Sequence, residues 1–179
     1  MEKKSNHIRK IAIVGPESTG KSTLTEALAK HFNEPFVTEI ARNYVSNLNR
    51  PYQLNDIIKM AELQLEEENK LRSKAKQFLF CDTTLLVHKI WASFVFNEIP
   101  TKIHQLYHPQ NYDLHLLCDI DLPWTFDPLR EHPNHREELF ELYENDLKIS
   151  QANYCIIRGK LEQREQNAIQ EIKLHFKST

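Results

Sequence analysis

The chain contains very little glycine. Only Gly15, Gly20 and Gly159 occur in 179 residues, whereas glycine usually makes up about 7% of a protein. Glycine is the residue that tight turns and close backbone approaches need, so the chain has few places for them. Two of the three glycines nevertheless stand five positions apart. The segment between Gly15 and Gly20 is therefore where backbone shape matters most.

Cysteine is also scarce, and metal-binding spacings are weak. Cys81, Cys118 and Cys155 lie in three separate predicted strands and form no C-x-x-C pair, so we expect buried reduced thiols rather than a disulfide or metal site. His132 and His135 have a His-x-x-His spacing, but a proline separates them. We expect solvated loop histidines there, with a zinc site as the alternative.

Long apolar runs and a strong excess of charge are missing too. No apolar run is long enough to span a bilayer, and the polar lead-in of residues 1–9 has no apolar signal core. The formal net charge is −2, which argues against nucleic-acid binding by electrostatics. We therefore expect a soluble cytoplasmic protein with neither a membrane nor a nucleic-acid partner.

A strand, a loop and a helix follow one another in KIAIVGPESTGKSTL, from Lys10 to Leu24. The loop, from Gly15 to Ser22, fits G-x-x-x-x-G-K-[ST], the phosphate-binding loop of P-loop NTPases. Its backbone N–H groups and the N-terminus of the following helix attract phosphate oxygens. A chance match at an ordinary turn is the alternative. The residues expected to bind ATP here are Gly15, Glu17, Ser18, Thr19, Gly20, Lys21, Ser22 and Thr23, with Lys21 reaching the β- and γ-phosphates and Ser22 ligating Mg²⁺.

Strand and helix patterns alternate along the rest of the chain. Further strands are expected at 36–38, 77–81, 112–118 and 154–157, and further helices at 39–45, 54–76, 85–97, 101–108, 135–150 and 161–176. This predicts an α/β fold, a single domain over residues 1–179 with a parallel sheet of about five strands and helices on both faces. In the 54–76 helix we expect Asn55 as the N-cap and Glu66 to Glu68 as a solvated face.

Polar residues follow the predicted strands, at the edge where ligands of open α/β sheets bind. Asp82 comes directly after the third strand. It is expected to hold Mg²⁺ or to accept the proton of an attacking hydroxyl, with a helix N-cap as the alternative. Glu39 follows the second strand and is expected to bind substrate hydroxyls or assist Mg²⁺, unless it is only a surface charge. Asp119 and Asp121 follow the fourth strand, and Asp121 is a candidate substrate ligand.

A proline-rich segment at about 121–136 is expected to be irregular and to cover the site as a lid. Arg130 and Arg136 are candidate catalytic residues that neutralise transition-state charge; alternatively they are surface arginines paired with Glu131 and Glu137. Trp124 either stacks on a flat substrate ring or packs beneath the lid.

Four further residues are candidate ligands. Arg42 and Tyr44 are expected to line the substrate pocket, with helix packing as an equal alternative. Gly159 follows the last strand and would let the backbone approach an adenine base, with Arg164 lying over that base. A plain turn glycine is the alternative.

Taken in order, the motifs GPESTGKSTL, EIARNYV, FLFCDTT, DLPWTFDPLRE followed by Arg136, and IIRGKLEQRE resemble a known family. That family is the ribosylnicotinamide kinase domain of the bifunctional NAD-biosynthesis regulator of bacteria. The resemblance covers Ile11 to about Phe176 and implies transfer of the ATP γ-phosphate to the 5′-hydroxyl of nicotinamide riboside. It also implies Lys21 and Ser22 as ATP and Mg²⁺ ligands, Asp82 beside the acceptor hydroxyl, Trp124 near the nicotinamide ring and Arg130 in the lid.

The chain departs from this family in two respects. The adenylyltransferase signature His-x-Gly-His and the DNA-binding helix-turn-helix of multidomain relatives do not fit before Lys10. We therefore expect the kinase module alone, or a kinase whose substrate choice has drifted. Pro128 also stands where a glycine is expected. The alternative functions are another nucleoside or deoxynucleoside kinase, or a regulatory ATPase switch acting through a protein partner. A guanine-nucleotide switch is disfavoured because the chain has no Asn-Lys-x-Asp motif.

Overall fold

Five short strands form one parallel sheet in the computed structural model, which describes residues 7–177. The strands lie in the order β2-β3-β1-β4-β5, so the strand before the phosphate-binding loop is central. They are β1 (Arg9–Val14), β2 (Phe36–Val37), β3 (Phe78–Asp82), β4 (Leu114–Cys118) and β5 (Tyr154–Ile157). The helices are α1 (Lys21–Phe32), α2 (Ile40–Ser46), α3 (Leu54–Arg72), α4 (Leu85–Phe96), α5 (Thr101–Leu106), α6 (Arg136–Ile149) and α7 (Glu162–Lys177), with a short 3₁₀ turn η1 (Pro109–Asn111) before β4. The predicted alternation of strands and helices is confirmed.

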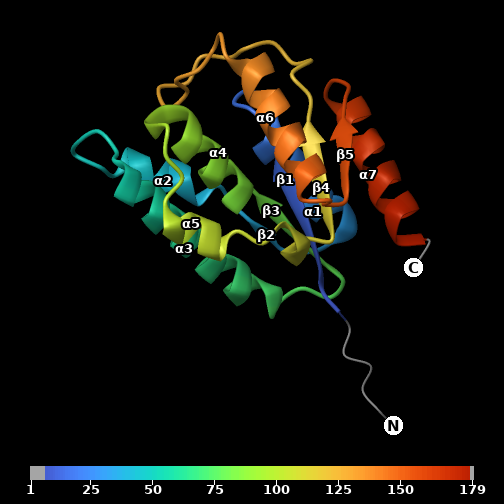
Figure 1. Ribbon diagram of the computed structural model, residues 1–179. Helices are drawn as coiled ribbons and strands as arrows, with labels where there is room; N and C mark the ends of the chain where they lie inside the picture. The colour runs from blue at the N-terminus through green and yellow to red at the C-terminus, as the bar shows by residue number, and fades with distance from the viewer. Residues whose placement is uncertain (1–6, 178–179) are drawn as a thin grey trace.

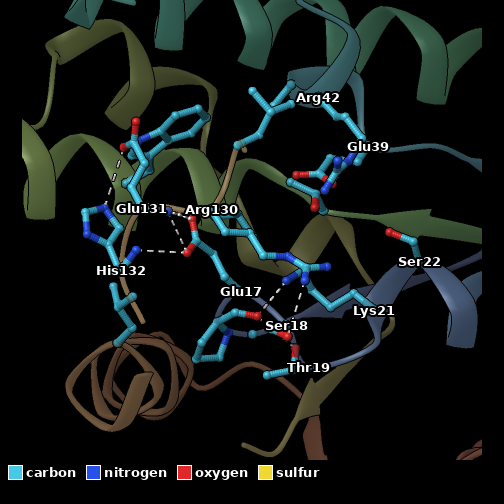
Figure 2. A pocket seen from close by; sticks show the side chains of 18 of the residues that line it. Glu17, Ser18, Thr19, Lys21, Ser22, Glu39, Arg42, Arg130, Glu131 and His132 are labelled. Atoms are coloured by element: carbon cyan, nitrogen blue, oxygen red, sulfur yellow. Dashed lines mark hydrogen bonds and ion pairs between the residues drawn. The ribbon is translucent and has the colours of Figure 1, made fainter. Parts of the chain in front are cut away.

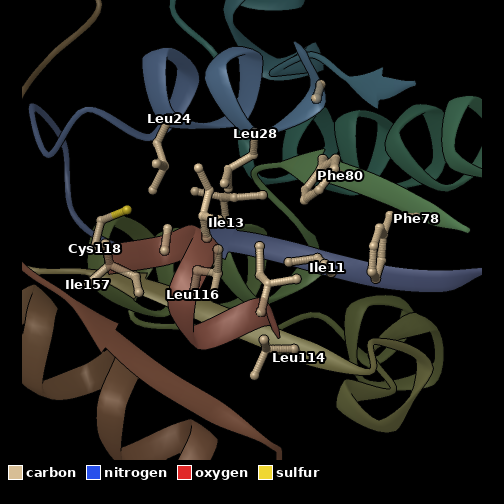
Figure 3. Close-up of a cluster of buried hydrophobic side chains, with 14 residues drawn as sticks. Ile11, Ile13, Leu24, Leu28, Phe78, Phe80, Leu114, Leu116, Cys118 and Ile157 are labelled. Atoms are coloured by element: carbon tan, nitrogen blue, oxygen red, sulfur yellow. The ribbon is translucent and has the colours of Figure 1, made fainter. Parts of the chain in front are cut away.

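Side chains of the central strand alternate between the two faces of the sheet. Ile11 and Ile13 belong to a buried cluster with residues of α1 and α7, which cover one face (Figure 3). Ala12 and Val14 belong to a second cluster with residues of α4 and α6 on the opposite face. The four residues are fully buried, as expected for a parallel strand covered on both sides.

The carboxyl ends of the strands share one edge of the molecule, and the proline-rich segment crosses above that edge between β4 and α6 (Figure 1). This segment contains no helix or strand, as predicted from its prolines. Both ends of the described chain lie toward the opposite edge (Figure 1). The fold therefore places the phosphate-binding loop and the proline-rich segment next to each other.

Two predictions about α3 are wrong. The N-cap is Gln53, not Asn55, and it forms a capping box in which the carboxylate of Asp56 accepts the backbone N–H of Gln53 at 2.7 Å. Glu68 is not solvated: its side chain is 1% exposed and lies 2.5 Å from Nζ of Lys10. The reason is that Ile57, Ala61, Gln64 and Glu68 follow one another at helical spacing on the buried face of α3.

The cysteine prediction holds for two of its three residues. Cys81 and Cys118 are free and buried, and Cys155 is free but only half-buried. Within residues 7–177, no group of three or more potential metal ligands among His, Cys, Asp and Glu comes together. None of the helices in this part of the chain is long and apolar enough to cross a membrane.

Candidate active site

The phosphate-binding loop curls between β1 and α1 with two glycines in left-handed backbone conformations. Gly15 has φ +138°, and a Cβ there would lie 2.8 Å from the carbonyl oxygen of Cys118. Gly20 has φ +77° and is the N-cap of α1. Side chains other than glycine rarely adopt such conformations, which explains why the chain keeps two of its three glycines in this loop.

Side chains of the loop hydrogen-bond back to its own backbone. Nζ of Lys21 donates to the carbonyl oxygen of Pro16 at 2.7 Å, and Oγ1 of Thr19 donates to the same oxygen at 2.8 Å. These bonds hold the loop in a tight curl. They also keep the Lys21 ammonium beside the loop that would receive a phosphate.

A cavity of about 210 Å³ lies beside the loop. The sequence predicted part of its lining: Gly15, Glu17, Ser18, Thr19, Gly20, Lys21, Ser22, Thr23, Glu39, Arg42 and Arg130 all line it. Asp82, Tyr44, Asp121, Trp124, Arg136, Gly159 and Arg164 are not among the lining residues. The phosphate-binding loop and Glu39 thus meet at one cavity.

Asp82 is the last residue of β3 and pairs in register with Ile13 at the end of β1. Its carboxylate is almost completely buried, and Oδ1 has no hydrogen-bond partner within residues 7–177. Burial raises the pKa of Asp82 to about 6, although the Ser22 hydroxyl and the Lys21 ammonium act in the opposite direction. The N-cap of α4 is Thr84, so the alternative of Asp82 as an N-cap is excluded.

Glu39 and Arg42 lie together at the start of α2. Nε of Arg42 is 3.6 Å from the Glu39 carboxylate, and Nη1 donates to Asp127 of the proline-rich segment at 2.8 Å. Tyr44 points elsewhere, because its hydroxyl donates to Asp56 at the start of α3. Arg42 therefore lines the cavity and ties the proline-rich segment to α2, whereas Tyr44 joins α2 to α3.

The two candidate catalytic arginines contact the phosphate-binding loop in different ways. Nη1 of Arg130 lies 3.4 Å from Oγ of Ser18 (Figure 2). The same nitrogen donates to the carbonyl oxygen of Thr125 at 2.5 Å. Arg136 donates to the carbonyl oxygens of Leu122 and Ser18 at 2.9 and 3.1 Å. Arg130 thus lines the cavity, while Arg136 fastens the base of the proline-rich segment to the loop. Neither arginine forms the alternative surface pair that its neighbouring glutamate would offer, as far as the described residues show.

Asp121, Gly159 and Arg164 form a separate cluster beyond the cavity. The buried guanidinium of Arg164 donates to the carbonyl oxygens of Ile157, Gly159 and Asp119 and to the Asp121 carboxylate. The same carboxylate accepts the backbone N–H of Gly159 at 2.6 Å. All three nitrogens of Arg164 are therefore engaged in joining the ends of β4 and β5. The residue is only 3% exposed, so its neighbours already cover the planar face that would lie over a base.

Sequence reasoning missed the aromatic wall of the cavity, which Tyr52, Trp91 and Phe94 help to line. The rings of Tyr52 and Trp91 meet edge to face at 4.9 Å, and Nε1 of Trp91 donates to the Tyr52 hydroxyl at 3.1 Å. Trp124 is half-buried but lies outside the lining. A signal was available, because Val87, Ile90, Trp91 and Phe94 recur at helical spacing on α4, directly after Asp82.

The chain is similar to known proteins in sequence and in fold. A protein family described as an AAA domain matches residues 10–164. The trifunctional NAD biosynthesis/regulator protein NadR of Escherichia coli strain K12 is 30% identical over 133 residues, which are 72% of this chain and 32% of NadR. NadR of Salmonella typhimurium has the same identity and coverage. The chain thus spans about a third of the length of the curated relatives that it matches.

Solved structures with the same fold include two complexes of NadR. One contains NR and has a TM-score of 0.75 at 23% identity; the other contains NAD and AMP-PNP and has a TM-score of 0.74 at 22% identity. Each match covers 94% of this chain and 49% of the NadR chain. Thymidylate kinase from Ehrlichia chaffeensis has a TM-score of 0.66 at 13% identity and covers 93% of this chain and 97% of that one. These likenesses confirm the predicted fold class, a P-loop α/β fold with a five-stranded parallel sheet.

Proposed function

This chain belongs to the AAA domain family, and from that premise we propose that it is an ATP-dependent kinase acting on a riboside. The reaction we propose is transfer of the γ-phosphate to the 5′-hydroxyl, with nicotinamide riboside as the preferred acceptor. The similarity to NadR, a protein of NAD biosynthesis, supports this substrate. We treat residues 1–179 as one kinase domain whose lid is residues 121–136.

The observation that supports the proposal most is that a single cavity joins the phosphate-binding loop to an aromatic wall. Lys21 stands at one side, and Tyr52 and Trp91 stand at another. Glu39 lines the same space. A kinase needs a triphosphate, an acceptor hydroxyl and a positioned carboxylate within reach of one another. An ATPase switch has no need of an aromatic pocket next to its phosphates.

Mg²⁺ fits the oxygen atoms that the site offers. The Asp82 carboxylate lies next to the Ser22 hydroxyl and keeps a buried oxygen without a partner. Oxygen donors of this kind are what Mg²⁺ prefers. When bound, Mg²⁺ would neutralise charge on the β- and γ-phosphates. We assign Ser22 and Asp82 to hold it.

The protein's own groups then position the reactants. Backbone N–H groups of the loop and the Lys21 ammonium hold the phosphates, while Glu39, which lines the cavity, receives the proton of the attacking hydroxyl. We place Asp82 on the metal side, because it is buried beside Ser22 rather than in the cavity lining. Arg130 offers a cation from the lid to the transferring phosphoryl group, and the closed lid excludes water.

The test is to incubate the protein with Mg-ATP and nicotinamide riboside, thymidine or uridine and to follow ADP. Turnover that depends on nicotinamide riboside supports the proposal. Turnover with thymidine or uridine instead would make the protein a different nucleoside kinase. Turnover that ignores every riboside but responds to a protein partner would support the regulatory ATPase.

A pair of tryptophan variants tests the position of the acceptor ring. If the ring lies against the aromatic wall, Trp91→Leu should raise KM for the riboside by roughly tenfold or more, with KM for ATP little changed. Trp124→Leu is the matched control, because Trp124 lies outside the cavity lining. If Trp124→Leu raises KM for the riboside more than Trp91→Leu does, the nicotinamide ring lies near Trp124, as the family resemblance implies.

A further inference from the structure

We propose that Glu131 is a positioning residue that couples nucleotide binding to acceptor binding. A residue of the phosphate-binding loop accepts a hydrogen bond from its backbone N–H. A residue of the aromatic wall donates a hydrogen bond to its carboxylate. The inference rests on the proposed kinase function and concerns the same cavity. It predicts that each substrate binds more tightly when the other is present.

The nucleotide side of this coupling is Glu17. Its carboxylate accepts the backbone N–H of Glu131 at 3.1 and 3.3 Å and that of His132 at 3.1 Å (Figure 2). A carboxylate within a phosphate-binding loop repels a triphosphate, so direct contact with ATP is not what it offers. Instead, the loop proposed to bind the phosphates also accepts hydrogen bonds from two successive backbone N–H groups of the lid.

The acceptor side is Tyr52. Its hydroxyl donates to the carboxylate of Glu131 at 2.5 Å and accepts the indole N–H of Trp91 at 3.1 Å. Tyr52 and Trp91 both line the cavity. A substrate ring that enters the cavity therefore contacts Trp91 and Tyr52. Trp91 is hydrogen-bonded to Tyr52, which is hydrogen-bonded to Glu131.

Glu131 is the residue where the two sets of contacts meet. The substrate that binds first strengthens the contacts on its own side of Glu131, and the second then binds to a lid that is already ordered. The two affinities become coupled, and the coupling is the same whichever substrate binds first. The contact between Arg42 and Asp127 also holds the lid, but it touches neither Glu17 nor Tyr52.

The experiment is a calorimetric titration of nicotinamide riboside into the protein, with and without saturating Mg-AMP-PNP. The measured quantity is the ratio of the two dissociation constants. We expect the wild-type protein to bind the riboside roughly tenfold more tightly with the nucleotide analogue present, within the usual range of such couplings. Tyr52→Phe removes only the hydroxyl and should bring the ratio close to one, with affinity for AMP-PNP alone unchanged.

Tyr154→Phe is the matched control. The Tyr154 hydroxyl donates to Glu144 at 3.0 Å, so this variant also deletes a tyrosine–glutamate hydrogen bond, but between β5 and α6. It should keep the wild-type ratio. Glu131→Gln should lower the ratio as Tyr52→Phe does, and the double variant should lower it no further, because both substitutions weaken the same contact.

The ratio separates coupling from simple contact. If Tyr52 only touches the riboside, Tyr52→Phe weakens binding equally with and without AMP-PNP, the ratio stays at its wild-type value and the inference is wrong. A wild-type ratio of one would also overturn it while leaving the kinase proposal intact. Failure of the wild-type protein to bind nicotinamide riboside, thymidine or uridine would overturn the kinase proposal, and this inference with it.

Discussion

Asp82 holds a carboxylate in a place where charge is unfavourable. Its side chain is buried at the end of β3, and burial raises its pKa to about 6. Above that pH the folded protein must keep a buried negative charge that the unfolded chain exposes to water. This cost in folding free energy is typical of residues that are retained for chemistry rather than for stability.

The substitution Asp82→Asn separates the contribution of the carboxylate to turnover from its effect on stability. We expect turnover to fall by about 10²-fold or more, because a neutral amide replaces the carboxylate beside Ser22. We also expect the free energy of unfolding at pH 8 to rise by up to about 3 kcal/mol, the equivalent of the raised pKa. The stabilisation should shrink as the pH falls from about 6 to about 4, where the native carboxyl is already protonated.

Steady-state ADP assays and chemical denaturation at pH 4, 6 and 8 measure both effects. Near-normal turnover would remove Asp82 from the mechanism. A loss of stability at pH 8 would show that the carboxylate has a structural partner.

At the scale of elements, a buried ion pair between Glu68 and Lys10 joins α3 to the sheet. Glu68 lies 2.5 Å from Nζ of Lys10 on β1, and the hydroxyl of Tyr112 donates to it at 2.8 Å. The ammonium of Lys10 also lies 4.3 Å from the centre of the Tyr112 ring. Removing the carboxylate would leave a nearly buried ammonium without its counter-ion.

Glu68→Ala should therefore destabilise the fold by about 3–5 kcal/mol. Glu66→Ala, two residues earlier on the exposed side of the same helix, should change stability by no more than about 0.5 kcal/mol. Urea denaturation of the two variants measures the difference. Equal, small effects would mean that water reaches Lys10 in solution.

The ends of β4 and β5 form a second element-scale unit, held by Arg164. A lysine lacks the planar fork that donates to three carbonyl oxygens, so Arg164→Lys should loosen the turn at Gly159. If that turn receives the base of ATP, KM for ATP should rise roughly tenfold while KM for the riboside stays constant.

Arg158→Lys is the control, since Arg158 is on the same turn but makes an exposed pair with Asp119. Both KM values should stay close to wild type in this control. Lower thermal stability of Arg164→Lys with an unchanged KM for ATP would show that Arg164 is only structural.

At the scale of the whole molecule, two buried histidines link stability to pH. His88 and His115 are completely buried, and burial lowers the pKa of each to about 4. In the unfolded chain they take up a proton near pH 6.5. Each histidine therefore contributes stability that is complete above about pH 6.5 and is lost as the pH falls toward 4, on the order of 3 kcal/mol each.

We expect the melting temperature to fall steeply between pH 6.5 and 4, because the opposing change at Asp82 is smaller than the sum of the two histidine contributions. His115→Gln should make the slope of melting temperature against pH shallower. His108→Gln, at an exposed position, should leave the slope at its wild-type value. Calorimetric melts across this pH range check the prediction, and a flat wild-type profile would contradict it.

The sequence by itself determined the features that depend on residues close together in the chain. The phosphate-binding loop follows from eight consecutive residues, and the layered sheet follows from the period of apolar residues within each segment. The carboxyl-end rule then placed Glu39 and Asp82 at the correct edge of the sheet. Two local features of α3 were misassigned: its N-cap, because a glutamine made the capping box, and the solvated glutamate face, because Glu68 is buried.

Only the tertiary structure decided which side chains meet across the molecule. Glu17 and Glu131 are 114 positions apart, and Arg164 reaches Asp121 from α7. Helical spacing groups Trp91 with Val87, Ile90 and Phe94, but only the tertiary structure shows that this face of α4 borders the cavity. Helical spacing likewise separates Glu68 from Glu66, but only the tertiary structure shows that Glu68 meets Lys10 of β1. Such contacts depend on how packed helices and strands orient their side chains in three dimensions, whereas motifs and periods describe only local stretches of chain.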